Sequence, residues 1–168
     1  TFTPETFACG VDICGMSNLT DRIDSFPPYW QSVIDLMAVR VGDVRTEEGR
    51  KLLAERSPIN YVDRIQRPLL IAQGANDPRA RQNESDRIVQ AMQKKDLPVT
   101  YVLYPDEGHG FARPENRLSF YAVTEAFLSQ HLGGRFEPIG DDFHNSSITV
   151  PVGAEEIPGL EDAITEIG

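Results

Sequence analysis

An aspartate and a histidine suited to proton transfer stand at matching places in the sequence. Asp77 lies four residues beyond Gln73, near the end of an apolar run, and His109 lies four residues beyond Pro105, at the end of a β-branched and aromatic run. If both runs are parallel strands, equal offsets bring the two side chains to the same rim of the sheet, where sites form in parallel α/β folds. The carboxylate can then orient the imidazole and stabilise the charge that it gains on taking up a proton. Either residue alone would more simply belong to a loop, and the matched positions make the pair specific.

The segments around this pair alternate between strand-like and helix-like patterns. Apolar or β-branched runs predict strands at 7–13, 68–74 and 99–105, and helical spacing or helix-starting residues predict helices at 30–41, 46–56, 84–95 and 114–132. This order is typical of a parallel sheet covered by helices. We therefore predict an α/β fold with three parallel strands flanked by helices. Three strands make a thin sheet for an independent domain, which indicates that further strands are missing.

No serine or cysteine stands where a nucleophile would complete the pair. The strand-to-helix turn that carries the nucleophile in α/β-hydrolases has the pattern G-x-S-x-G. Ser17 lacks the second glycine of this pattern, and neither Cys9 nor Cys14 has a glycine two residues before it. Because the nucleophile precedes the acid and the base along the chain in these enzymes, we expect it upstream of Thr1. The sequence accordingly reads as a piece of a longer protein.

The charge of the sequence excludes some partners. The formal charge is −10, which does not fit a nucleic-acid partner, because phosphate contacts need a basic face. No apolar run approaches the roughly 20 residues of a membrane span, so no membrane partner is expected. The acidic surplus is concentrated at residues 133–168, which hold eight carboxylates and one arginine. We therefore predict a hydrolase portion at 1–134, followed by a solvated acidic tail at 135–168.

The two cysteines indicate a reducing compartment. Cys9 and Cys14 are five residues apart in a stretch that reads as extended chain. Five extended residues span roughly 16 Å, whereas bridged Cα atoms lie within about 7 Å. They are not expected to pair, and a cytoplasmic location follows as the simpler interpretation. His131, at the end of a predicted helix, and His144, in the acidic tail, are expected to be structural or solvent-facing.

Three ordered segments resemble a known family. Residues 57–62 (SPINYV), 68–79 (PLLIAQGANDPR) and 104–111 (YPDEGHGF) are similar to the C-terminal catalytic part of the prolyl oligopeptidase family, nearest to its acylaminoacyl-peptidase and dipeptidyl-aminopeptidase-like branch. The resemblance covers about residues 1–137. It implies the C-terminal part of an α/β-hydrolase fold in a serine peptidase, with Asp77 and His109 as the triad acid and base and the serine on a segment before Thr1. It implies no cofactor and no metal.

The same resemblance suggests residues that bind substrate. The family often has an arginine two residues after the triad aspartate that grips a substrate carbonyl, and Arg79 stands there, although the next residues differ from the usual Val-Pro. A solvated loop arginine is the alternative. Tyr29 and Trp30 resemble an aromatic segment near the specificity pocket, and core packing is the alternative for Trp30. The expected partners are a peptide substrate, the missing N-terminal part of the catalytic domain, and a second copy of the chain pairing at an exposed sheet edge.

Two other functions remain open at this level. A small-molecule esterase or dienelactone-hydrolase-like enzyme would use the same fold, and the residues around the nucleophile would distinguish it from a peptidase. A non-catalytic module that binds a partner through its open sheet edge is the alternative of a different class. Without the nucleophile, this chain alone is expected to be inactive in either hydrolase interpretation.

Overall fold

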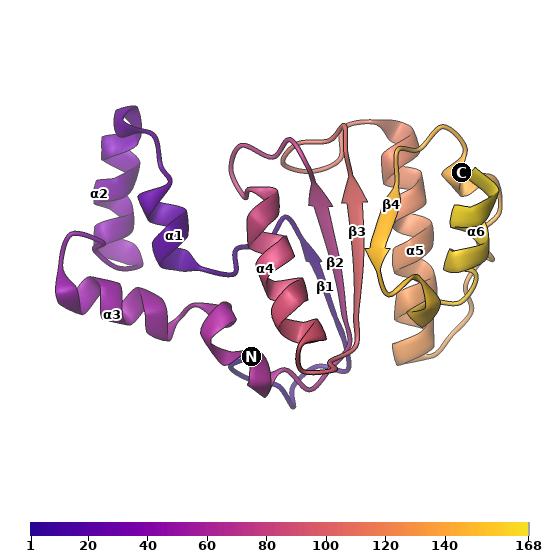
Figure 1. Cartoon of the computed structure of the whole chain (residues 1–168), viewed down its shortest axis with the longest axis horizontal. Helices are drawn as coiled ribbons and strands as arrows, with labels where there is room; N and C mark the ends of the chain where they lie inside the picture. The colour runs from indigo at the N-terminus through magenta and orange to yellow at the C-terminus, as the bar shows by residue number, and fades with distance from the viewer. Residues whose placement is uncertain (168) are drawn as a thin grey trace.

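The computed structural model describes residues 1–167 and contains a four-stranded sheet with helices on both faces (Figure 1). The strands follow the order β1-β2-β3-β4 across the sheet. β1, β2 and β3 are parallel, as predicted, but β4 runs antiparallel to β3 and lies in the segment predicted to be a solvated tail. The strands are β1 (Gly10–Ile13), β2 (Leu69–Gly74), β3 (Val99–Tyr104) and β4 (Thr149–Val152).

The two central strands are buried on both faces, which is why they read as continuous apolar runs. Alternate residues such as Leu70 and Val102 pack with α5 (Pro114–Leu132), whereas Ile71 and Tyr101 belong to the cluster that includes α4 (Gln82–Gln93). α4 and α5 therefore cover opposite faces of the sheet.

The helices between β1 and β2 form a smaller unit beside α4 (Figure 1). Their own apolar cluster is built around Ile23, Phe26, Val44 and Leu53. Two of these helices are capped by side-chain oxygens: Asn18 caps the helix Leu19–Asp24, and Thr46 caps the helix Glu47–Glu55. The elements are α1 (Leu19–Asp24), η1 (Pro28–Trp30), α2 (Gln31–Arg40), α3 (Glu47–Glu55) and η2 (Pro58–Arg64).

The prediction of a solvated acidic tail is wrong. Phe143, Ile148 and Leu160 are almost fully buried in the core cluster on the α5 side. The apolar residues are spaced among the carboxylates, so the charge of the segment concealed a buried face. Besides β4, the segment forms η3 (Asp141–Phe143), η4 (Ala154–Glu156) and α6 (Leu160–Ile167).

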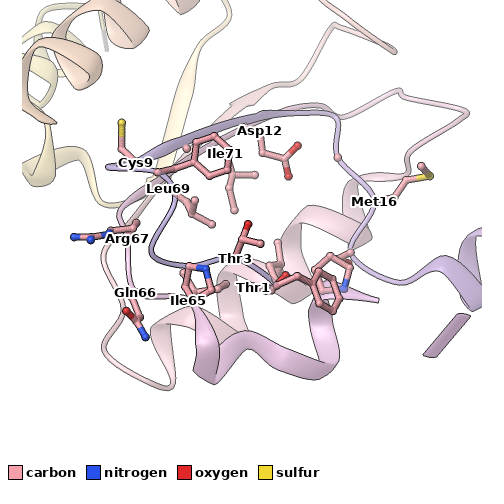
Figure 2. A pocket seen from close by; sticks show the side chains of 18 residues that line it. Thr1, Thr3, Cys9, Asp12, Met16, Ile65, Gln66, Arg67, Leu69 and Ile71 are labelled. Atoms are coloured by element: carbon pink, nitrogen blue, oxygen red, sulfur yellow. The ribbon is translucent and has the colours of Figure 1, made fainter. Parts of the chain in front are cut away.

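β1 is one of the two edge strands of this sheet. Within residues 1–167 it pairs only with β2, in a register that runs from Gly10 opposite Leu69 to Ile13 opposite Ala72. A largely apolar hollow of about 510 Å³ lies beside it (Figure 2) and is lined by residues from the N-terminal segment, β1 and β2. Within the same residues, no helix is both long and apolar enough to cross a bilayer.

Candidate active site

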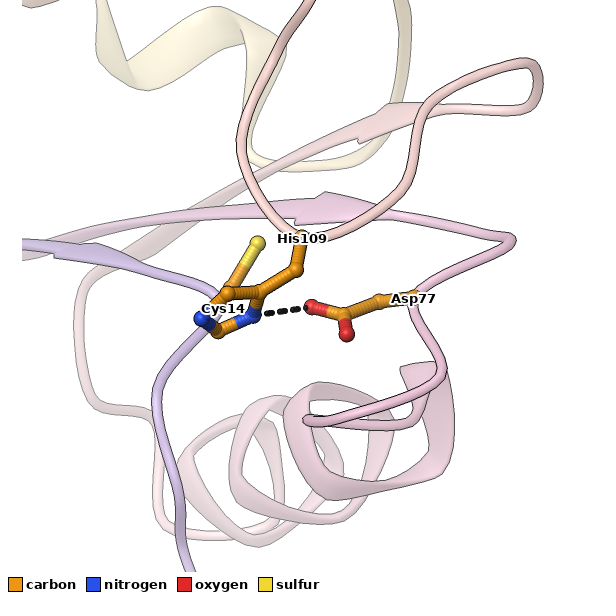
Figure 3. A group of neighbouring side chains, drawn as sticks. All are labelled: Cys14, Asp77 and His109. Atoms are coloured by element: carbon orange, nitrogen blue, oxygen red, sulfur yellow. Dashed lines mark hydrogen bonds and ion pairs between the residues drawn. The ribbon is translucent and has the colours of Figure 1, made fainter.

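Asp77 and His109 meet at the carboxyl ends of β2 and β3. His109 Nδ1 lies 2.8 Å from Asp77 Oδ2, within hydrogen-bond distance (Figure 3). The Asp77 side chain is fully buried, whereas 42% of the His109 side chain is exposed. The predicted geometry is thus confirmed: a buried carboxylate holds one ring nitrogen and leaves the rest of the ring accessible.

Local hydrogen bonds keep the Asp77 carboxylate charged. Its other oxygen, Oδ1, accepts hydrogen bonds from the backbone N–H groups of Arg79 at 2.7 Å and Ala80 at 2.9 Å. Burial alone would raise the pKa of Asp77, but the hydrogen bonds from His109 and from these two backbone groups outweigh it, so that this pKa lies below its usual value. Asp77 is therefore an anion that can stabilise a charged imidazole.

A buried glutamine anchors the loop that carries Asp77. Gln73, the penultimate residue of β2, donates from Nε2 to the carbonyl oxygen of Ala80 at 2.9 Å. Ser85 on α4 donates from Oγ to Gln73 Oε1 at 2.8 Å. The loop between β2 and α4 is thus held at both ends, which fixes the position of the carboxylate.

A buried glutamate organises the loop that carries His109. Glu107 accepts hydrogen bonds from the backbone N–H groups of Ala112 and Arg113, at 2.8 and 2.9 Å, and from Asn116 Nδ2 at 2.8 Å. Because Asn116 belongs to the first turn of α5, these bonds connect the loop to a long helix. The histidine therefore projects from a loop with a rigid base.

Asn76 joins the two loops to each other. Its backbone N–H donates to the carbonyl oxygen of Glu107 at 2.9 Å, and its Nδ2 donates to the carbonyl oxygen of Pro105 at 2.8 Å. The spacing between Asp77 and His109 is consequently set by backbone contacts as well as by their own hydrogen bond.

The structure adds Cys14 to the site, a residue that sequence reasoning considered only as a nucleophile or as a disulfide partner. Cys14 follows β1, is buried, and has a positive φ of 52°. Its thiol lies 3.9 Å from the carbonyl oxygen of Gly108, at the base of the His109 loop, and close to the Asp77 carboxylate. Burial raises the pKa of this thiol. Part of the signal was present in the sequence, because Cys14 follows β1, the first of the three predicted parallel strands, and so reaches the same rim.

The predicted substrate-binding residues are divided between two places. Arg79 adjoins Asp77 and lines a polar hollow of about 350 Å³, together with three further arginines and with Asp21, Asp24 and Glu84. Tyr29 and Trp30 lie in η1, in the unit formed by α1–α3, where Trp30 packs against Phe26. Neither has a ring or hydrogen-bond contact with Asp77 or His109 among the residues described by the structure.

The sequence of residues 1–135 matches the model of the prolyl oligopeptidase family. The chain belongs to this family. Its four-stranded sheet with flanking helices is part of the α/β-hydrolase fold of these peptidases. The family resemblance of the three short segments is thereby confirmed.

Individual relatives of this prolyl oligopeptidase family chain are peptidases. It is 63% identical to dipeptidyl aminopeptidase BIII of Pseudoxanthomonas mexicana, over 98% of this chain and 24% of that protein. It is 50% identical to dipeptidyl peptidase family member 6 of Caenorhabditis elegans, over 89% of this chain and 20% of that protein. The solved puromycin-hydrolyzing peptidase of Mycobacterium tuberculosis superposes with a TM-score of 0.66 and 29% identity, covering 80% of this chain and 19% of that one. The chain thus spans about a quarter or less of the length of these relatives.

Proposed function

We propose that this chain supplies the acid and the base of the catalytic triad of a serine peptidase. The observation that carries the proposal is the 2.8 Å contact between His109 Nδ1 and the buried, anionic Asp77. In this arrangement the second ring nitrogen, Nε2, is the one that faces a nucleophile and exchanges its proton. The serine would come from a part of the protein outside the 168 residues of this sequence.

The proposed reaction has two steps. His109 takes the proton of the serine hydroxyl as the oxygen attacks the scissile carbonyl, and it then gives that proton to the departing amine. In the second step His109 activates a water that hydrolyses the acyl-enzyme. Asp77 holds the ring in one tautomer and stabilises the imidazolium throughout.

The proposed substrate is a peptide from which dipeptides are released. The 63% identity to a protein named dipeptidyl aminopeptidase supports this class. Arg79 is proposed to bind a carbonyl of the peptide, because its backbone N–H donates to Asp77 Oδ1 and its side chain, which begins beside the dyad, is exposed. Tyr29, 81% exposed, is proposed to border the substrate path, with Trp30 packed against it. The free thiols of Cys9 and Cys14 support a reducing, cytoplasmic location.

The decisive experiment uses a longer protein that includes the segment upstream of Thr1. Hydrolysis of dipeptidyl anilides is measured for the wild type and for His109→Ala and His131→Ala. Loss of the triad histidine should lower kcat by about 10⁶-fold. His131, whose ring packs on Phe127 in α5, serves as the control and should leave kcat nearly unchanged. Wild-type turnover in His109→Ala would disprove the proposal.

A further inference from the structure

Three different metal-binding side chains converge where the parallel strands end. A thiol, a carboxylate and an imidazole are contributed by Cys14 after β1, Asp77 after β2 and His109 after β3. Their ligand atoms all lie within 4.8 Å of one another (Figure 3). We propose that Cys14, Asp77 and His109 form a binding site for Zn²⁺.

The donor set fits zinc better than a hard cation. Zn²⁺ binds thiolate sulfur, imidazole nitrogen and carboxylate oxygen, usually in four-coordinate geometry, whereas Mg²⁺ and Ca²⁺ prefer oxygen alone. The thiol must lose its proton on binding. Zinc drives that loss, because a coordinating thiol is deprotonated outright by the ion.

The distances require only small movements. Tetrahedral coordination at ordinary zinc bond lengths places nitrogen and oxygen ligands about 3.3 Å apart, and sulfur about 3.5 Å from either. The 2.8 Å contact between His109 and Asp77 would widen by about 0.5 Å. No other ligand pair would have to close by more than about 1.3 Å, since none is further apart than 4.8 Å.

His109 is the one exposed ligand, and it also marks the side from which an ion can enter. Cys14 and Asp77 are buried and fixed by their strands and loops, whereas the His109 side chain is 42% exposed and lies between Gly108 and Gly110. An ion can therefore reach the two buried ligands from the exposed side of the imidazole.

A zinc ion here would oppose the proposed peptidase chemistry. It would occupy the carboxylate oxygen and the imidazole that the acid–base steps need, so bound zinc would inhibit the longer enzyme. This consequence rests on the proposed function, but the binding site does not. Failure of the zinc site can thus be distinguished from failure of the peptidase assignment by measuring binding to this chain directly.

The test is a titration of the 168-residue chain with Co²⁺ and with Zn²⁺. Co²⁺ bound to a thiolate gives a charge-transfer absorption in the near ultraviolet, which should appear at one equivalent in the wild type. It should persist in Cys9→Ser and vanish in Cys14→Ser. Cys9 is the matched control, because it precedes β1 whereas Cys14 follows it. For Zn²⁺, calorimetry should give a single site whose affinity falls more than about tenfold in Cys14→Ser, since even the loss of an outer-shell partner has that effect.

The exposed ligand provides a second variant in case Cys14→Ser does not fold. His109→Ala removes a half-exposed side chain and should lower zinc affinity more than about tenfold, whereas His144→Ala should not. Absence of one-to-one binding, a charge-transfer band that survives in Cys14→Ser, or unchanged zinc affinity in His109→Ala would each overturn the proposal.

Discussion

Gly74 and Gly108 approach so closely that neither loop can move independently of the other. A β-carbon at Gly74, the last residue of β2, would lie 2.2 Å from the carbonyl oxygen of Gly108, immediately before the catalytic candidate His109. The carbon would meet backbone rather than a flexible side chain. The end of one strand thus determines where the histidine loop of the next strand can lie.

Gly74→Ala should therefore displace the His109 loop and destabilise the chain. We expect a loss of about 1–3 kcal/mol in the free energy of unfolding, the usual range for overpacking. Urea denaturation gives this value, and the imidazole resonances of His109 report the broken contact with Asp77. Gly133→Ala is not a suitable control, because Gly133 has a positive φ of 77°. Val39→Ala is suitable instead, since the Val39 side chain is 87% exposed on α2, and it should be nearly neutral. Equal stability of Gly74→Ala and the wild type would contradict the argument.

Acidification should remove the stabilisation that Asp77 provides. Because the pKa of Asp77 is lowered by folding, the unfolded chain binds its proton more readily, and the contribution is present above about pH 4 and lost as the pH falls through the folded pKa. Asp77→Asn should cost about 2 kcal/mol at pH 6, the order of a hydrogen bond to a charged group. The difference from the wild type should shrink below pH 4. Denaturation curves of both proteins between pH 6 and pH 3 test this prediction. A difference in stability that does not change with pH would contradict it.

Asp12 should show the opposite pH dependence. Burial raises its pKa, so the folded chain holds the proton more tightly, and stability is lost as the pH rises through the folded pKa. Asp12→Asn should therefore stabilise the chain at pH 7 and have little effect at pH 3. Parallel measurements on Asp12→Asn and Asp77→Asn compare a carboxylate on β1 with one in the loop after β2. Destabilisation at pH 7 by both variants would show that the Asp12 charge is compensated.

The sequence alone predicted the parts of the structure that depend on local pattern. Periodicity located β2, β3 and α5, because strands buried on both faces and long helices have clear signals. The pairing of Asp77 with His109 followed from equal offsets after consecutive parallel strands. Predicting this pairing required only that the two strands be parallel neighbours in the sheet.

The parts that were missed depend on tertiary contacts. β4 has four residues of which two are exposed, and its pairing with β3 cannot be read from so short a segment. Leu160 is fully buried beside exposed Glu161, so an acidic count could not distinguish a packed helix from a solvated tail. Cys14 reaches the site only because β1 ends beside Ala72 of β2, a register that the sequence does not specify.

This chain alone should show no hydrolytic turnover above background. It holds the proposed acid and base, but removal of the nucleophile from a triad costs on the order of 10⁶ in kcat. The oxyanion hole would also be incomplete, because one of its donors follows the nucleophile. Assays with a nitrophenyl ester and a peptide anilide test the expectation. Turnover that is abolished by His109→Ala would reveal a nucleophile within these 168 residues, and Cys14→Ser would show at once whether it is the buried thiol.

The open edge of β1 should make the chain self-associate. Within residues 1–167, β1 has no strand on its outer side, and its free N–H and C=O groups can pair with another copy. Apolar side chains surround the edge: Phe7 is 65% exposed and Ile13 48% exposed. We therefore expect dimers or larger species of the isolated chain by sedimentation, with a mass that increases with concentration.

Ile13→Lys is the direct test of this association, because it places a charge on the edge without emptying the core. The variant should sediment as a monomer at concentrations at which the wild type does not. Val39→Lys is the matched control: Val39 is 87% exposed on α2, so the same change in charge and hydrophobicity occurs away from the sheet. Association that persists in Val39→Lys but not in Ile13→Lys assigns it to the β1 edge. If Val39→Lys alone abolished it, the contact would instead lie on the α1–α3 unit. A strictly monomeric wild type at high concentration would contradict the prediction.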